Sequence, residues 1–112
     1  MNIDVVLDEL VQDGEEDWIG LWEIAQDVEE LLGIDDPMRN LEVTITLVKA
    51  LLERGFCAGE SPLASVVEFI AWPDQNPDTV ADLIRREWRH RGTLPGWGDC
   101  PWFARRCRRC FT

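Results

Sequence analysis

The sequence predicts a mainly α-helical domain with a small β-hairpin, an α+β fold class. Three observations predict it: apolar residues recur at helical spacing in four segments, each such segment has a capping residue or a closing glycine, and a stretch after the third segment alternates with period two. At 112 residues the chain has the usual length of one domain. We expect a single compact domain over residues 1–104 and a basic C-terminal tail over residues 105–112.

The first two helices are predicted in the first third of the chain. Residues 3–12 carry apolar side chains at helical spacing behind Asn2, which can cap them, and the DGEED sequence that follows is expected to end this helix. Asp17 is a good N-cap for a second helix over residues 18–32. Gly33 follows the last apolar position, where a closing glycine is favoured.

The third and fourth helices have the clearest boundaries. An Asp-Pro pair at 36–37 and an Asn-Pro pair at 76–77 each place a capping side chain before a proline at the first helical position. Gly55 and Gly92 are expected to end these two helices. The β-branched run VTIT lowers the propensity of the third helix, so packing must hold it.

A β-hairpin is predicted between these two helices. The sequence FCAG at 56–59 and the alternating sequence SVVEFIAW at 65–72 are the two strand candidates, and GESPLA connects them. Residues 93–112 are rich in glycine and proline, so we expect an irregular, loop-like C-terminal segment that frays after Arg105.

The order of three helices, a hairpin and a helix resembles a winged-helix domain. The second and third helices would be the helix-turn-helix pair and the hairpin the wing; the resemblance covers residues 3–72 and rests on element order. The chain also resembles a set of small uncharacterised bacterial helical proteins, which implies a compact helical fold with a small hairpin. The segments that carry this second resemblance are DWIGLWEI at 17–24, LLERG at 51–55, FIAWP at 69–73, IRREW at 84–88 and GDCPWF at 98–103.

Charge is distributed very unevenly along the chain. The formal net charge is -11, yet residues 1–36 contain thirteen acids and no Lys or Arg, whereas residues 85–112 contain eight Arg and two acids. Such a field attracts a basic partner to the first third and repels nucleic acid from it. The chain is therefore an acidic body with a basic end.

These features predict a binding protein. In size, acidity and lack of catalytic motifs the chain is similar in profile to bacterial toxin-immunity proteins, and this implies a non-enzymatic inhibitor that neutralises a basic toxin, such as a nuclease, through an acidic surface. Trp18 and Trp22 lie beside the acids and can supply aromatic anchors or simply core. The predicted partner-binding residues are Asp13, Glu15, Glu16, Asp17, Trp18, Trp22, Glu23, Asp27 and Glu30.

The winged-helix order suggests a DNA-binding regulator or scaffold subunit as an alternative. A recognition helix displays basic or amide side chains to bases and phosphates, and the third helix offers Arg39, Asn40, Lys49 and Arg54 for this. It also carries Glu42 and Glu53, and the helix before it is acidic. The electrostatics therefore disfavour phosphate contact.

The cysteines suggest a further alternative, a small zinc-binding accessory protein. Cys107 and Cys110 form one Cys-x-x-Cys pair, with Cys100 and Cys57 as possible further ligands, but a structural zinc site usually has two such pairs or added histidines. We favour free thiols and expect no metal or cofactor. A redox pair would need a thioredoxin-like strand and helix, which the sequence lacks.

The sequence gives little support for catalysis. A single histidine, His90, leaves little room for a Ser/His or Cys/His arrangement, and neither a P-loop nor a GxGxxG motif is present. The N-terminus has no basic start with an apolar run, and no segment is apolar enough to span a bilayer. We expect a non-enzymatic cytoplasmic protein.

Overall fold

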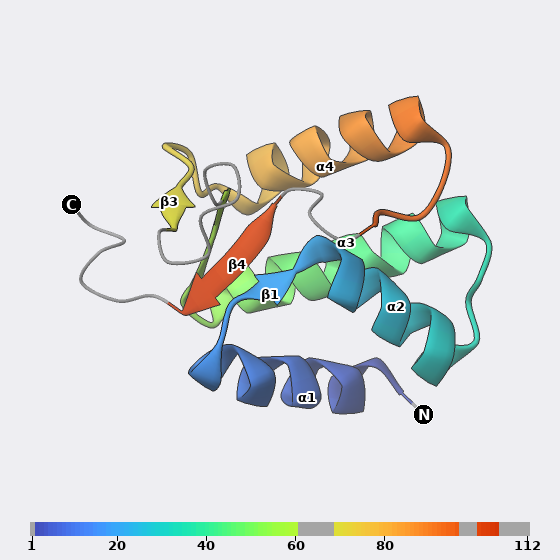
Figure 1. Ribbon diagram of the computed structural model, residues 1–112, viewed down its shortest axis with the longest axis horizontal. Helices are drawn as coiled ribbons and strands as arrows, with labels where there is room; N and C mark the ends of the chain where they lie inside the picture. The colour runs from blue at the N-terminus through green and yellow to red at the C-terminus, as the bar shows by residue number, and fades with distance from the viewer. Residues whose placement is uncertain (1, 61–68, 97–100, 106–112) are drawn as a thin grey trace.

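The computed structural model describes residues 2–60, 69–96 and 101–105 and has a mainly helical α+β fold (Figure 1). Four helices and a small antiparallel sheet make up this part of the chain. The elements in order are α1 (Ile3–Glu16), β1 (Ile19–Gly20), α2 (Leu21–Leu32), α3 (Pro37–Glu53), β2 (Phe56–Glu60), β3 (Ile70–Ala71), α4 (Pro77–Arg91) and β4 (Trp102–Arg105).

The helix α3 runs through the middle of the molecule. Figure 1 shows α4 on one side of it and α1 on the other, with α2 beside it, and α3 contacts all three of these helices and β2. Seven of its residues are buried, and they are Asn40, Leu41, Thr44, Ile45, Leu47, Val48 and Leu51. A helix buried on several faces is stabilised by packing, as the VTIT sequence requires.

The predicted starts of α3 and α4 and the predicted end of α4 are confirmed, whereas α3 ends at Glu53 with Arg54 as its C-cap, and Gly55 follows with φ +96°. Asp36 accepts a hydrogen bond from the Arg39 backbone N–H at 3.0 Å, and Pro37 follows as the first helical residue. Asn76 accepts from the backbone N–H of Asp78 at 2.9 Å in the same way. Gly92 ends α4 with φ +79°, a conformation that glycine adopts at little cost.

The sheet has the order β1-β4-β2-β3, with every pairing antiparallel. The expected hairpin is confirmed where Gly59 and Glu60 of β2 pair with Ala71 and Ile70 of β3, while residues 61–68 of the expected connection and second strand lie outside the described residues. The prediction of an irregular C-terminal segment is wrong for residues 102–105, because these residues form β4, which lies between β1 and β2 in the sheet. Phe103 lies opposite Ile19 on one side and Ala58 on the other, and it is fully buried.

Gln75 extends the sheet with its side chain. Its Oε1 accepts from the Ala58 backbone N–H at 2.7 Å, and its Nε2 donates to the Ala58 carbonyl at 2.7 Å and to the Trp72 carbonyl at 2.9 Å. An amide side chain thus takes the place of a paired backbone residue, which satisfies groups that would otherwise lose hydrogen bonds.

The first helix is longer than the sequence predicts. We expected DGEED to end it, but α1 continues to Glu16 and takes Gly14 into its interior. Gly14 is buried, and a Cβ atom placed there would overlap the ring of Phe56 on β2 and the side chain of Ile19. The glycine is therefore a packing residue, because its missing side chain lets α1 approach the sheet.

The second helix begins later than predicted. Gly20, not Asp17, is its N-cap, and Asp17 is instead the extended residue that ends α1. The reason is that Ile19 and Gly20 pair with β4, so this segment must be extended before the helix can begin. The Asp17 carboxylate accepts from the adjacent Trp18 backbone N–H at 2.7 Å. The predicted closing residue Gly33 is confirmed, with φ +69°.

None of the described helices combines the length and the apolar character that crossing a bilayer requires.

We predict that Gly14→Ala destabilises the fold by about 1–3 kcal/mol, because the added methyl group overpacks the contact with Phe56 and Ile19. At an exposed helical position the same change would instead stabilise by about 0.5–1 kcal/mol. Urea unfolding measures the difference, with Gln12→Ala on the exposed side of α1 as the control. A gain in stability for Gly14→Ala would contradict the close approach of α1 and β2.

Candidate functional site

A pocket of about 460 Å³ lies where the end of α1 meets the start of α2. Five residues of the predicted partner-binding set line it, and Gln12 completes the lining. We call it the acidic pocket, and its lining residues are Gln12, Asp13, Glu16, Asp17, Trp18 and Glu23. Four carboxylates and one indole therefore surround a space large enough for a long side chain.

The short connection between the two helices creates this arrangement. Because β1 turns the chain back after Asp17, the last turn of α1 is brought beside the first turn of α2. Carboxylates on α1 follow one another at helical spacing, and so do those on α2, so the two acidic rows face each other. We call these residues the acidic cluster: Glu9, Asp13, Glu16, Asp17, Glu23, Asp27 and Glu30.

Two members of the cluster on α2 show the effect of this crowding. Partial burial, and then repulsion from Asp13, Asp27 and Asp17, raise the pKa of Glu23, although a hydrogen bond from the Gly20 backbone acts in the opposite direction. Burial also raises the pKa of Asp27, with further repulsion from Asp13, Glu9 and Glu30. Asp13 acts on both groups, so it is the electrostatic centre of the cluster.

Cations on the described part of the chain do not neutralise the cluster. Two acids of α1 form ion pairs, Asp8 with Arg54 at 4.0 Å and Glu15 with Arg105 at 3.3 Å. Across residues 2–60, 69–96 and 101–105, no ion pair reaches Asp13, Glu16, Asp17, Glu23, Asp27 or Glu30. Glu30 accepts a hydrogen bond from Gln26 at 3.1 Å.

The predicted partner-binding residues therefore fall into two groups, those that line the acidic pocket and those that lie outside it. Asp13, Glu16, Asp17, Trp18 and Glu23 are together at the acidic pocket. Asp27 is coupled to Asp13, and Glu30 is coupled to Asp27. Glu15 is paired with Arg105 on β4 and lies outside the pocket lining.

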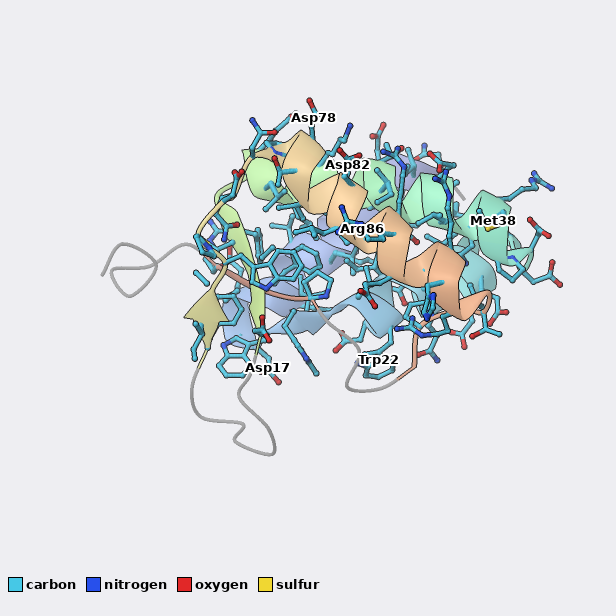
Figure 2. The ribbon with its side chains drawn as sticks, turned by 90° about the horizontal axis from the view of Figure 1, so that it is seen from above. Asp17, Trp22, Met38, Asp78, Asp82 and Arg86 are labelled. Atoms are coloured by element: carbon cyan, nitrogen blue, oxygen red, sulfur yellow. The ribbon has the colours of Figure 1, made fainter. Side chains whose placement is uncertain are left out.

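The two tryptophans differ in their surroundings. Trp18 is half-buried in the pocket wall, and its ring lies 5.5 Å from that of Phe69 at an angle of 54°. Trp22 does not line the pocket, and its Nε1 is buried without a hydrogen-bond partner among the described residues. Figure 2 shows Asp17 and Trp22 on the edge of the molecule away from Asp78 and Asp82 of α4. Of the two, Trp18 is the one that lines the acidic pocket.

Sequence reasoning missed Glu9 and Gln12. Gln12 lines the pocket, and Glu9 acts on Asp27. The spacing of four residues from Glu9 to Asp13, and again from Glu23 to Asp27, is the signal that would have found Glu9, because residues four apart share one helix face. Nothing in the sequence pattern marks Gln12 as a pocket residue.

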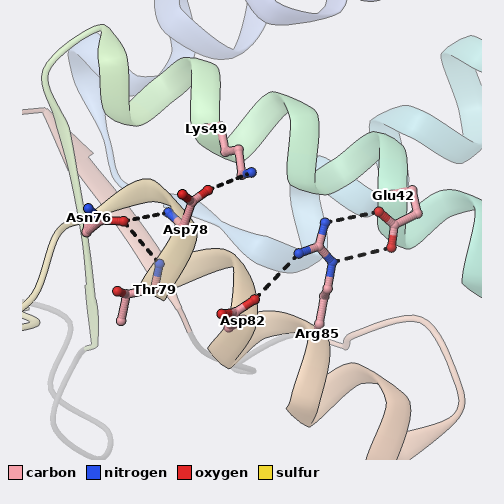
Figure 3. Close-up of polar contacts among 7 residues, drawn as sticks. All are labelled: Glu42, Lys49, Asn76, Asp78, Thr79, Asp82 and Arg85. Carbon is pink, nitrogen blue, oxygen red and sulfur yellow. Dashed lines mark hydrogen bonds and ion pairs between the residues drawn. The ribbon is translucent and has the colours of Figure 1, made fainter.

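The surface between α3 and α4 is different, because its charges are paired within the molecule (Figure 3). Lys49 Nζ lies 3.0 Å from the Asp78 carboxylate. The Arg85 guanidinium donates to Glu42 at 3.1 and 3.4 Å and lies 3.6 Å from Asp82. Exposed pairs of this kind contribute about 0–1 kcal/mol each, and one of them occupies Lys49, a basic residue that a DNA-contacting α3 would present.

One of the four cysteines lies within the described residues. Cys57 is buried in β2, while Cys100, Cys107 and Cys110 lie outside them, so the expected state of these thiols stays a prediction. Over the described ranges, no three His, Cys, Asp or Glu side chains are grouped as metal ligands would be.

Comparison with protein-family models, with curated proteins and with solved structures gave no match to this chain.

We predict that salt stabilises the fold. Raising the ionic strength from about 0.01 M to about 1 M shortens the Debye length from about 30 Å to about 3 Å, which screens the repulsion within the acidic cluster. Urea unfolding is the suitable measurement, because urea is uncharged. Asp13→Asn is expected to stabilise the protein by about 0.5–1 kcal/mol at low salt, since each like-charge contact between neighbouring side chains costs about 0.2–0.5 kcal/mol.

Asp35→Asn is the control for this experiment, because Asp35 is an exposed acid between α2 and α3 that acts on neither Glu23 nor Asp27. Equal stabilisation by the two substitutions would show that net charge, and not the cluster, is responsible.

Proposed function

We propose that the protein is a non-enzymatic binding protein whose acidic pocket and surrounding cluster dock a basic protein partner. The observation that carries this proposal is the meeting of carboxylates from α1 and α2 around Trp18, with no ion pair to them from the described residues. Such a site attracts cations at long range, and its indole offers an aromatic face on which a guanidinium can stack.

The most concrete form of this proposal is an immunity or antitoxin-like inhibitor of a basic toxin, such as a nuclease. A nuclease site accepts phosphate charge, and a row of carboxylates imitates that charge. The cluster would steer association, while Trp18 and the apolar groups near it would set the lifetime of the complex. In this role the protein would act in the cytoplasm, where it would reach the toxin before the toxin reaches nucleic acid.

The repulsion within the cluster supports this proposal. Partial burial, and then repulsion from neighbouring acids, disfavours the ionised forms of Glu23 and Asp27 in the free protein. A partner that supplies cations relieves this cost, so it gains affinity from a cost that the free protein already carries. Carboxylates that are already ion-paired within the free protein would not provide this gain.

We predict that the double charge reversal Asp13→Lys/Asp27→Lys weakens binding to a basic partner at least tenfold, mainly by slowing association. The candidate partner is the product of the adjacent open reading frame, tested by co-expression for relief of toxicity and by binding kinetics with purified proteins. The matched control is Asp35→Lys/Glu53→Lys, which changes the net charge equally at exposed positions away from the pocket. An equal loss in both double variants would remove the acidic pocket as the docking site.

A winged-helix DNA-binding regulator is the second candidate, and the α1-β1-α2-α3-β2-β3 order of elements favours it. The packing of α4 on α3, and the ion pairs Lys49–Asp78 and Arg85–Glu42, argue against it. This candidate predicts that duplex DNA is retarded on a gel at low salt and released as salt rises. The absence of retardation at low salt would contradict it.

A further inference from the structure

The edge of β2 that faces β3 is only partly covered by a strand. Strand β2 has five residues and β3 has two, so β3 pairs with Gly59 and Glu60, and among the described residues no strand continues along β2 past them. Both backbone groups of Ala58 point to this edge, because its N–H bonds to Gln75 and its carbonyl bonds to Trp72. An edge of this kind is a template on which another strand can add.

The backbone pairing along this edge ends at Pro73. Trp72 donates its backbone N–H to the Ala58 carbonyl at 2.9 Å, but Pro73 has no N–H with which to continue the ladder. The chain then turns into α4, whose N-cap is Asn76. The N–H of the fully buried Ala58 therefore needs a partner other than a strand, because a buried N–H without a hydrogen bond is costly.

The side chain of Gln75 supplies that partner. Its Oε1 accepts from the Ala58 N–H at 2.7 Å, and its Nε2 donates to the Ala58 carbonyl at 2.7 Å and to the Trp72 carbonyl at 2.9 Å. A side-chain amide carries the same kinds of donor and acceptor as a peptide group. Gln75 therefore presents to β2 the groups that the backbone of a neighbouring strand would present.

The chain around Gln75 is held in place by its own hydrogen bonds. Asp74 accepts from the Asn76 backbone N–H at 2.8 Å. Asn76 in turn accepts from the backbone N–H groups of Asp78 and Thr79 at the start of α4 (Figure 3), and α4 packs on α3. Because the backbone that follows Gln75 is fixed in this way, its amide is directed onto β2 by the fold.

We infer that Gln75 closes the edge of β2 against pairing with a second copy of this chain. A second copy suits this edge because two identical edges can pair antiparallel about a two-fold axis, and each then supplies the donor and acceptor that the other lacks. Ile70 of β3, which lies opposite Glu60 of β2, is 50% exposed and would add apolar contact to such a pair. This role of Gln75 concerns the free chain and does not depend on docking at the acidic pocket.

The net charge of the chain opposes such pairing without preventing it. Each copy carries a formal charge of -11. Repulsion between two copies extends over a Debye length of about 30 Å at about 0.01 M salt, but of only about 8 Å at about 0.15 M. Charge alone therefore does not keep the edges apart at physiological ionic strength, and association through an opened edge should increase with salt.

The first experiment measures the protection of Ala58. In Gln75→Ala we expect amide hydrogen exchange at the Ala58 N–H, followed by NMR, to be about tenfold faster, because that group loses its hydrogen bond. Gln75→Asn is the milder second variant, since it keeps the amide but shortens the side chain by one methylene, and it should raise the same rate. Gln26→Ala, the same change at an exposed glutamine of α2, is the control. An unchanged Ala58 rate in the Gln75 variants would overturn the inference.

The second experiment measures self-association by sedimentation velocity over a range of protein and salt concentrations. We expect Gln75→Ala to dimerise under conditions in which the natural sequence does not, and to do so more strongly as salt rises. Adding Ile70→Lys places a charge beside the opened edge, so the double variant should return to monomer while its Ala58 amide still exchanges rapidly.

Gly92→Ala separates opening of the edge from a general loss of stability. Gly92 ends α4 with φ +79°, at the opposite end of that helix from Gln75, and a side chain there is strained. We expect this variant to be less stable but monomeric. Association of Gly92→Ala to the same extent as Gln75→Ala would overturn the inference, and so would a Gln75→Ala variant that stays monomeric under every condition.

Discussion

The burial of α3 is the constraint on which the rest of the structure depends. It presents apolar residues on several sides, and its two buried polar residues are hydrogen-bonded to each other, to α2 and to the loop before α3. Asn40 donates to the carbonyls of Ala25 in α2 and Ile34 in the loop at 3.0 Å each, and Thr44 donates to Asn40 at 2.9 Å. Because α1 and α2 both cover α3 and also contact each other, their acidic sides meet at the surface. The acidic cluster is thus a consequence of how the core is covered.

In this arrangement, apolar burial stabilises α1 and α2, whereas repulsion between their carboxylates destabilises them. Val6, Leu10, Ile24 and Val28 bury apolar surface that holds α1 and α2 in place, at about 25 cal/mol for each Å² removed from water. The carboxylates on the outer sides of the two helices act against that gain. Such a compromise is common where a surface serves binding, because the features that suit a partner do not suit the free protein. The unfavourable charge on the outer sides of α1 and α2 therefore supports the proposed docking role of the acidic pocket.

The sequence was informative where the signal was local and misleading where a distant partner decided the structure. The caps Asp36 and Asn76 act within one turn, so the starts of α3 and α4 were predictable. The local pattern predicts that α1 ends at DGEED, because the contact that requires Gly14, with Phe56, lies 42 residues away. The late start of α2 and the existence of β4 depend on one pairing, Ile19 with Phe103, that no local pattern shows. For the site, the sequence supplied the acids, but only the packing of α1 on α2 shows which of them face one another.

The central position of β4 has a consequence for how the molecule assembles. Strands β1 and β2 do not pair with each other; each pairs with β4, which is the last of the described elements to leave the ribosome. All four helices can therefore be made, and α3 can be covered, while two strand edges are still without a partner. Unpaired edges are where chains add to one another, so the nascent protein is exposed to aggregation until residues 102–105 close the sheet. Completion of the fold is thus timed by its last strand.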